Sequence, residues 1–505
     1  MAESTTADTT EASSKSPIDT STASSQNGND DSVTTIIRKL LKSQPGRSAS
    51  RVGVVFKHLT VAAPDSETAI VKTLPLAIWN TFGTDQFRFL KNIFGTNAKG
   101  RTVNILSDFT GLVKPGEMLF VLGRPGSGCS TFLRAVANQS SLAVSGDISF
   151  AGIPHTEFKK THRRETIYLP EEDRHIASLS VSQTLKFALT MNLPSDFRDN
   201  ATVDELVTTL GSMFGLEHAL QTPVGGPYSP GVSGGEKKRV SIAEVLAAGS
   251  SVQCFDNSTR GLDSSTALDF VRALRTLTDV GQNTTLATLY QAGQSIYNHF
   301  DKVTLLSEGH QVFFGRADEA EAHFAGLGYV KIPGQTTAEF LTTVTDMAQR
   351  KFAPGTAAEQ IHTAADLAAA FRSSAIYSRL QQEISDYQQA QATEPEPLST
   401  SLYNLAFPMQ IWQCLRREYL LVRAQRMVYY TKWVTTIILS FVIGSEYFDL
   451  ANNASGAFSR SGILFYSLIF NGWLQFPELF DAHTNRPVLE RQGMYCVSLK
   501  LILNC

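Results

Sequence analysis

The chain has 505 residues, of which 42% are hydrophobic and 18% charged, so it is long enough for more than one domain with a sizeable core. The net charge of −3 gives no argument for a nucleic-acid partner. The five cysteines form no CxxC pair, so they indicate no disulfide framework and fit a reducing compartment.

The N-terminal region differs in composition from the rest of the chain. Residues 1–34 are rich in Ser, Thr and Asp and contain almost no large apolar side chains. Such a segment buries too little apolar surface to fold, and it lacks the charged-then-apolar pattern of a secretory signal. We therefore expect residues 1–50 to be a disordered Ser/Thr-rich region.

Apolar strands and helical segments alternate over residues 51–350, which predicts an α/β layered domain. The predicted strands are 52–56, 58–61, 118–122, 251–256, 284–290 and 302–307, with an edge hairpin at 311–314. The predicted helices include 131–138 and 262–278. Residues 351–406 predict a helical and linker segment, helical over 357–392.

A glycine-rich loop, GRPGSGCST, lies at residues 123–131, between a predicted strand and a predicted helix. The phosphate-binding pattern G-x-x-x-x-G-K-[ST] wraps phosphates with backbone N–H groups and reaches them with its lysine. Gly123, Gly128 and Ser130 match this pattern, but Cys129 stands at the lysine position. The loop is therefore a candidate nucleotide site that lacks its usual cation.

The last hundred residues predict the start of a membrane domain, 407–505. Residues 407–430 alternate apolar side chains with arginines, as in a basic amphipathic helix at a membrane surface. Residues 427–448 are long and apolar enough to span, and 461–480 is a second candidate that contains polar residues. The arginines before the first span predict that the α/β domain lies in the cytosol.

Two further motifs follow the loop in the order typical of one family. GVSGGEKKRVSIAE lies at 231–244 and FDNSTRGLDSST at 255–266. Together with the loop they resemble the ATP-binding cassette (ABC) transporters. The form of the signature, the loop cysteine, TRGLDSSTALDF and QTTAEFLTTVTD at 335–346 are similar to subfamily G, the fungal pleiotropic drug resistance group. The resemblance implies an α/β P-loop NTPase, the ABC nucleotide-binding domain, followed by α-helical transmembrane segments.

The same resemblance implies ATP and Mg²⁺ as cofactors. It assigns nucleotide contacts to Gly123, Pro125, Gly126, Gly128, Cys129, Ser130, Thr131, Ser233, Gly234, Gly235, Glu236 and Asp263. It assigns the metal to the Ser130 hydroxyl and the Asp256 carboxylate. The signature residues serve the ATP of a facing cassette, where the N-terminus of the following helix points at the phosphate.

Four positions of the chain's own site depart from the catalytic pattern. Cys129 supplies no fixed positive charge, and Asn257, at the position of the family's glutamate, cannot act as a general base. Tyr290 aligns with the switch histidine and Glu171 with the Q-loop glutamine, with Glu172 as the neighbouring alternative for that alignment. No intact catalytic set remains, which predicts a site that holds nucleotide and hydrolyses it poorly.

The resemblance also implies partners and a location. In the drug resistance group, a first cassette with a degenerate site donates its signature to a second nucleotide-binding domain, and hydrolysis occurs at that composite site. The expected function is ATP-driven export of hydrophobic compounds across a lipid membrane, by the same resemblance the plasma membrane, without nucleic acid.

Other functions stay open on the sequence alone. A membrane-tethered regulatory cassette that does not transport is one, because about two spans are predicted where the family half has six. A non-functional truncated product is another, because the tail MYCVSLKLILNC departs from the family pattern. A soluble cassette acting on ribosomes or DNA is disfavoured by the apolar run at 427–448.

Overall fold

The computed structural model describes residues 51–64, 102–139, 142–193, 198–226, 229–356, 361, 363–393, 398, 405–449 and 453–495. The region predicted to be disordered, most of the predicted linker at 393–399 and the C-terminal tail lie outside the described residues.

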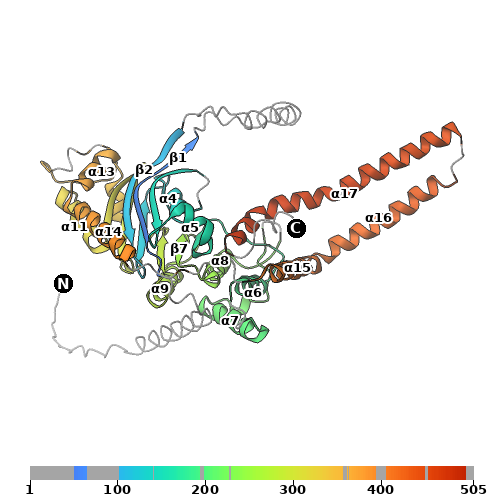
Figure 1. The fold of residues 1–505 in the computed structure, drawn as a ribbon, viewed down its shortest axis with the longest axis horizontal. Coiled ribbons are helices and arrows are strands. Elements are labelled where there is room, and N and C mark those ends of the chain that lie inside the picture. The colour runs from blue at the N-terminus through green and yellow to red at the C-terminus, as the bar shows by residue number, and fades with distance from the viewer. Residues whose placement is uncertain are drawn as a thin grey trace, which may run out of the picture.

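Within the described residues, a ten-stranded sheet organises the α/β domain (Figure 1). The strands are β1 (Val54–Pro64), β2 (Thr102–Val113), β3 (Met118–Gly123), β4 (Ala143–Phe150), β5 (Ile153–Pro154), β6 (Thr166–Leu169), β7 (Val252–Phe255), β8 (Thr284–Ala287), β9 (Lys302–Ser307) and β10 (His310–Arg316). Their order is β5-β4-β1-β2-β10-β9-β3-β8-β7-β6. Strands β9, β3, β8, β7 and β6 pair in parallel, which places their carboxyl ends at one edge.

Several strand predictions differ from the structure. The predicted strands 52–56 and 58–61 are parts of one strand, β1. The segment 311–314 is a strand, but β10 lies between β2 and β9 and is therefore not at an edge. Strand β8 ends at Ala287 and not at residue 290, and β7 ends at Phe255. The residues beyond these ends turn away from the sheet, where their polar groups are available to a site.

Helices cover both faces of the sheet. They are α4 (Cys129–Val136), α5 (His155–Thr161), α6 (Val181–Asn192), α7 (Asn200–Met213), α8 (Gly234–Ala248), α9 (Ser264–Gly281), α10 (Gln294–Tyr297), α11 (Ala317–Leu327), α12 (Thr337–Val344), α13 (Ala364–Arg372) and α14 (Ala375–Thr393), with the short 3₁₀ turns η3 (Arg163–Glu165) and η5 (Glu217–Ala219). Capping boxes start α6, α8, α12 and α13, since a Ser or Thr and the residue three positions later satisfy each other's backbone N–H.

Aromatic side chains fill the core between the sheet and α4. Phe56 of β1 is fully buried, with ring centroids 5.3 Å from Phe132 and 5.9 Å from Phe314. These edge-to-face contacts join the helix that follows the glycine-rich loop to strands β1 and β10. This packing fixes the position of α4, and with it the glycine-rich loop, relative to the sheet.

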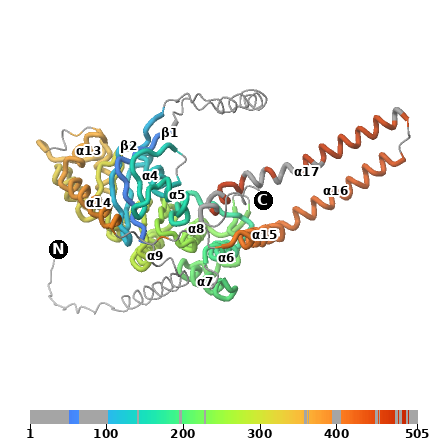
Figure 2. Tube along the Cα trace, viewed as in Figure 1, coloured from blue at the N-terminus to red at the C-terminus, as the bar shows by residue number. Residues whose placement is uncertain are grey.

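The described residues after 405 form α15 (Phe407–Ala424), α16 (Arg426–Glu446) and α17 (Ala454–Tyr495). Among the described residues, α16 alone is long and apolar enough to cross a membrane. Gln425 leaves helical geometry, so the amphipathic helix predicted over 407–430 is shorter than expected. The predicted second span, 461–480, is helical but lies inside α17, which is less apolar than α16. Helices α16 and α17 project from the α/β domain as a long hairpin (Figures 1 and 2).

The base of this hairpin packs on the α/β domain. Val488 of α17 lies in a small apolar cluster with Ile176 and Leu179, which follow β6. Arg417 of α15 donates to the Gln492 side chain at 2.6 Å, and its guanidinium lies 5.1 Å from the ring of Phe187 in α6. The C-terminal helices α15 and α17 are therefore tied to α6 and to the segment that leads into it from β6.

Candidate functional site

A cleft of about 1040 Å³ opens at the carboxyl ends of β3, β7 and β8. It is lined by the glycine-rich loop, by the segments after β7 and β8, and by α12. The predicted site residues that line it are Gly123, Pro125, Gly126, Gly128, Cys129, Ser130, Thr131, Glu171, Asp256, Asn257 and Tyr290. The structure thus brings together residues separated by more than 160 positions, at the edge where parallel sheets bind ligands.

The loop enters α4 through a left-handed turn. Gly128 has φ +101°, and a Cβ there would lie 2.6 Å from Leu106 Cδ2, so only glycine fits. The backbone N–H groups of the first turn of α4 have no partner within the helix, as at any helix start. A glycine-rich loop opening onto such a turn is a ready site for phosphate.

Cys129 is a neutral group at the base of the cleft. Its Sγ lies 3.4 Å from Ser127 Oγ. Burial, with a smaller contribution from the nearby Asp256 carboxylate, raises the pKa of the thiol to about 11. At neutral pH the side chain therefore carries no charge and cannot replace a lysine.

The Asp256 carboxylate is almost fully buried and held from two sides. Its Oδ2 accepts from the Tyr168 hydroxyl at 2.6 Å, and its Oδ1 accepts from Thr288 Oγ1 at 2.9 Å. Arg134 of α4 donates to the Tyr168 oxygen at 3.0 Å and so brings a cation to the same chain of hydrogen bonds. Burial and the adjacent Asp256 charge raise the pKa of Tyr168, which keeps its hydroxyl protonated as a donor.

The opposite wall of the cleft carries the other three altered positions. Asn257 has φ +47°, and its N–H donates to Thr288 Oγ1 at 2.7 Å. Tyr290 is half exposed, and its N–H donates to Thr259 Oγ1 at 2.9 Å. Glu171 forms an ion pair with Arg260, which lowers the pKa of its carboxyl. Glu172, the alternative at this position, is exposed and pairs with Arg174.

The signature residues lie outside this cleft, at the start of α8. Ser233 Oγ accepts from the Glu236 N–H at 3.3 Å, and the Glu236 carboxylate accepts from the Ser233 N–H at 2.8 Å. A Cβ on Gly234 would meet nothing within 4 Å, and Gly235 lies beside the segment that caps α9 at Asp263. The start of α8 is therefore an exposed surface, open to an external group.

A buried polar cluster joins α8 to the segment after β6. Ser241 Oγ donates to Asp173 at 2.6 Å and lies 2.7 Å from His175 Nε2. Lys238 Nζ donates to the Glu171 carbonyl at 2.6 Å. Since Ile176 follows directly and packs on α17, one short segment contacts the cleft, α8 and the C-terminal helix α17.

Comparison with known proteins identifies the family. Residues 106–260 match the family described as ABC transporter, and residues 409–503 match the ABC-2 type transporter family. The chain is 41% identical over 478 residues to the ABC multidrug transporter atrF of Aspergillus fumigatus, which covers 90% of the chain and 31% of that protein. The chain belongs to the ABC transporters. The predicted fold, an ABC nucleotide-binding domain followed by helical membrane segments, is confirmed.

Other relatives agree with subfamily G. The chain is 34% identical over 473 residues to ABC transporter G family member 14 of Dictyostelium discoideum, covering 90% of the chain and 32% of that protein. It is 37% identical over 430 residues to the ABC transporter ATP-binding protein/permease PDR18 of Saccharomyces cerevisiae, covering 80% of the chain and 32% of that protein. This ABC transporter chain spans about a third of the length of the curated relatives it matches.

The residues of the ABC cleft fit a magnesium nucleotide. A carboxylate offers about four acceptor positions, and Asp256, which lines the cleft, uses one on each oxygen within the protein, so acceptor capacity is left for a hydrated cation. The Ser130 hydroxyl lines the same cleft at the start of α4. These two groups are of the hard-oxygen type that Mg²⁺ prefers.

Several lining residues were not predicted from the sequence. They are Ile105, Arg124, Arg260, Thr288, Leu289, Gln291, Ala292, Gly293, Ala338, Glu339 and Thr342, with Val121 and Leu122 below the loop. Arg260 lies inside the motif FDNSTRGLD, so its place in the cleft could have been predicted from that motif. The α12 residues Ala338, Glu339 and Thr342 lie inside the stretch QTTAEFLTTVTD, but nothing in that stretch or around Ile105 indicates a place beside the loop, because only the fold brings these residues there.

Proposed function

We propose that this chain is a hydrolysis-poor cassette of a multidrug efflux transporter. It binds ATP with Mg²⁺ in its own cleft and donates its signature to a second cassette. Hydrolysis at that composite site drives export of hydrophobic compounds, with the nucleotide-binding domain in the cytosol at the plasma membrane. The name of the relative atrF, an ABC multidrug transporter, supports this class of cargo.

One observation carries the proposal: a well-formed cleft combines intact binding groups with missing catalytic groups. The loop, Ser130 and Asp256 supply phosphate and cation contacts. Cys129 is neutral, and the side-chain amide of Asn257 takes no proton from water. Binding energy is therefore retained, whereas stabilisation of the charge that develops during phosphoryl transfer is reduced.

Each group of the cleft has a separate task in this proposal. The loop N–H groups orient the phosphates, and Tyr168 and Thr288 hold Asp256 toward the cation. Bound Mg²⁺ would neutralise phosphate charge. The exposed start of α8 supports a role for Ser233 and Gly234 toward the nucleotide of the second cassette.

The contacts of the segment after β6 support coupling to transport. Asp173 and His175 bond Ser241 of α8, while Ile176 packs with Val488 of α17. A displacement of α8 when two cassettes close would reach the membrane helices through this short, packed segment.

The test compares both halves of the asymmetry in a full-size two-cassette transporter that contains this chain. Ser233→Arg places a bulky side chain on the signature and is expected to abolish transport-coupled ATPase. Ser130→Ala alters only the hydrolysis-poor site and is expected to lower activity less than threefold. Thr363→Arg removes a capping box of the same kind on α13 and serves as the matched control, with no loss expected.

Equal losses from Ser233→Arg and Ser130→Ala would refute the asymmetric proposal. Full activity of Ser233→Arg together with loss in Ser130→Ala would favour a cassette that hydrolyses in its own site. Membrane fractions and limited proteolysis establish that all three variants fold alike, so that a loss of activity reports on the site.

A further inference from the structure

The charged residues that line the ATP cleft do not leave an unpaired cation for the phosphates. Among the described lining residues, the cations are Arg124 and Arg260, against the carboxylates of Glu171, Asp256 and Glu339. Arg124 pairs with Asp346 at 3.3 Å, and Arg260 pairs with Glu171. With Cys129 neutral, an entering polyphosphate meets a cleft whose two guanidiniums are already bound to carboxylates.

Arg260 stands on the wall where the catalytic positions of the family are altered. It follows Asn257 by three residues, and its partner Glu171 also accepts a hydrogen bond from the Asn257 side chain. Tyr290 lies close enough to Arg260 to contribute to the raised pKa of that guanidinium. Arg124 instead belongs to the glycine-rich loop and forms its ion pair with Asp346, just after α12. Arg260 is therefore the guanidinium beside the positions that face a terminal phosphate.

The Arg260–Glu171 pair is easily exchanged. The Arg260 side chain is 67% exposed and that of Glu171 is 36% exposed, and ion pairs at such positions contribute little to stability. A terminal phosphate offers guanidinium two parallel acceptors and more negative charge than a carboxylate. Exchange of Glu171 for phosphate thus gains more than it loses.

We propose that Arg260 binds the terminal phosphate of ATP in this cleft, in place of the missing lysine, and that Glu171 holds it aside until ATP enters. The inference rests on the proposed function, since it requires that the cleft binds ATP. It adds a selectivity: ADP lacks the terminal phosphate and leaves the Arg260–Glu171 pair closed. The cleft then distinguishes ATP from ADP by an ion-pair exchange.

Two substitutions are expected to act in opposite directions. Arg260→Ala removes the phosphate ligand and weakens ATP binding about tenfold, the typical loss for one charge-assisted hydrogen-bonding group. Glu171→Gln removes the competing carboxylate and tightens ATP binding about threefold. Both leave ADP binding within twofold of the wild type, and the double variant binds ATP like Arg260→Ala. A pair that served only to support the fold would weaken binding in both variants.

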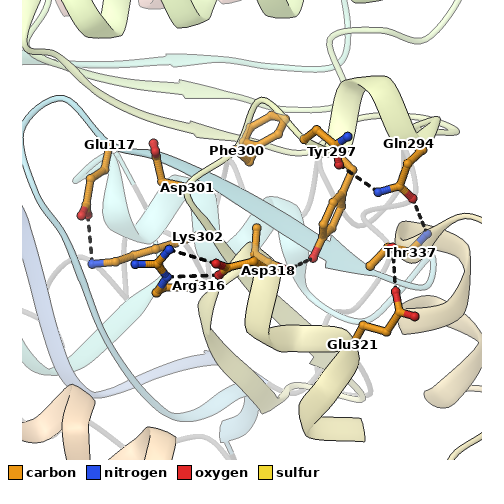
Figure 3. A pocket seen from close by; sticks show the side chains of 12 residues that line it. Glu117, Gln294, Tyr297, Phe300, Asp301, Lys302, Arg316, Asp318, Glu321 and Thr337 are labelled. Atoms are coloured by element: carbon orange, nitrogen blue, oxygen red, sulfur yellow. Dashed lines mark hydrogen bonds and ion pairs between the residues drawn. The ribbon is translucent and has the colours of Figure 1, made fainter. Parts of the chain in front are cut away.

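The measurement uses the full 505-residue chain in lipid nanodiscs with Mg²⁺. Equilibrium titrations with ATP, a non-hydrolysable ATP analogue and ADP give three values of Kd for each variant. The matched control is Arg316→Ala, because Arg316 forms a similar exposed ion pair with Asp318 at 2.9 Å in a separate cavity of about 530 Å³ (Figure 3). It is expected to change none of the three constants.

The outcomes separate this inference from the proposed function. Wild-type affinity for ATP in Arg260→Ala, equal weakening of ATP and ADP, or weakened ATP binding in Glu171→Gln would each overturn the role of Arg260. In those cases the wild-type chain still binds ATP, and the proposed function stands. If the wild-type chain binds no ATP, the proposed function fails and this inference fails with it.

Discussion

Replacing Tyr168 by Phe removes one hydroxyl from the chain of hydrogen bonds below the cleft. The hydroxyl donates to Asp256 Oδ2 at 2.6 Å, and Asp256 is only 4% exposed. Removing a donor from a buried charged acceptor costs about 2 kcal/mol. Loss of the Arg134 hydrogen bond to the same hydroxyl adds little to this cost, because the Arg134 guanidinium reaches solvent. The phenylalanine ring also preserves the contact that this guanidinium makes 5.4 Å from the ring of Tyr168. We expect Tyr168→Phe to lower the local free energy of opening of β6 and β7 by that amount.

Amide hydrogen exchange of the full chain, resolved by peptide, measures this effect directly. A loss of about 2 kcal/mol speeds exchange in β6 and β7 by about thirtyfold. The matched control is Tyr297→Phe, because the Tyr297 hydroxyl is also buried but donates to the neutral Ala317 carbonyl at 2.8 Å (Figure 3). Its loss costs about 1 kcal/mol, or about fivefold in local exchange. Equal effects of the two variants would refute the argument that the charge of Asp256 sets the magnitude.

Two further predictions concern the glycine-rich loop. Burial raises the pKa of Cys129 to about 11, so at pH 8 ~0.1% of this side chain is thiolate, against ~24% of an ordinary thiol. A more basic thiolate is also more nucleophilic, which offsets part of this difference. Iodoacetamide should therefore react with Cys129 about tenfold more slowly than with an ordinary thiol. The rate should rise with pH up to about 11, as followed by peptide mass spectrometry; a rate equal to that of the unfolded chain at pH 8 would contradict this. Gly128→Ala should destabilise the chain by about 2 kcal/mol and weaken ATP binding, since its Cβ meets Leu106, whereas Gly126→Ala, with a similar φ of +86° but open space, should cost less. Equal losses in thermal unfolding would show that packing against Leu106 plays no part.

Much of the fold and of the cleft was predictable because the signals are local. Apolar runs mark β3, β7, β8 and β9, and the fixed spacing within GRPGSGCST and FDNSTRGLD places glycines and acids directly after strands. Parallel strands then bring these ends to one edge of the sheet. The altered positions, such as Cys129 and Asn257, follow from the same motifs.

The missed features depend on which strands and segments become neighbours. Tyr168 and Asp256 are 88 positions apart and meet because β6 pairs with β7, while Arg260 and Glu171 are 89 positions apart. Strand order decides such pairs, and no local pattern encodes it. The same cause made β10 an interior strand. The end of α15 was misplaced because apolar and basic residues alternate on both sides of Gln425, so the break leaves no mark in the pattern.

The fate of ATP bound to this chain tests the central claim most directly. The full chain, alone in lipid nanodiscs, is loaded with Mg²⁺ and ATP, separated from free nucleotide, incubated, and then denatured so that the released nucleotide is identified and counted. The account predicts about one ATP per chain, recovered unchanged. Recovery of ADP and phosphate above the level of a Ser130→Ala and Asp256→Asn double variant would contradict the claim that this cleft binds ATP without hydrolysing it.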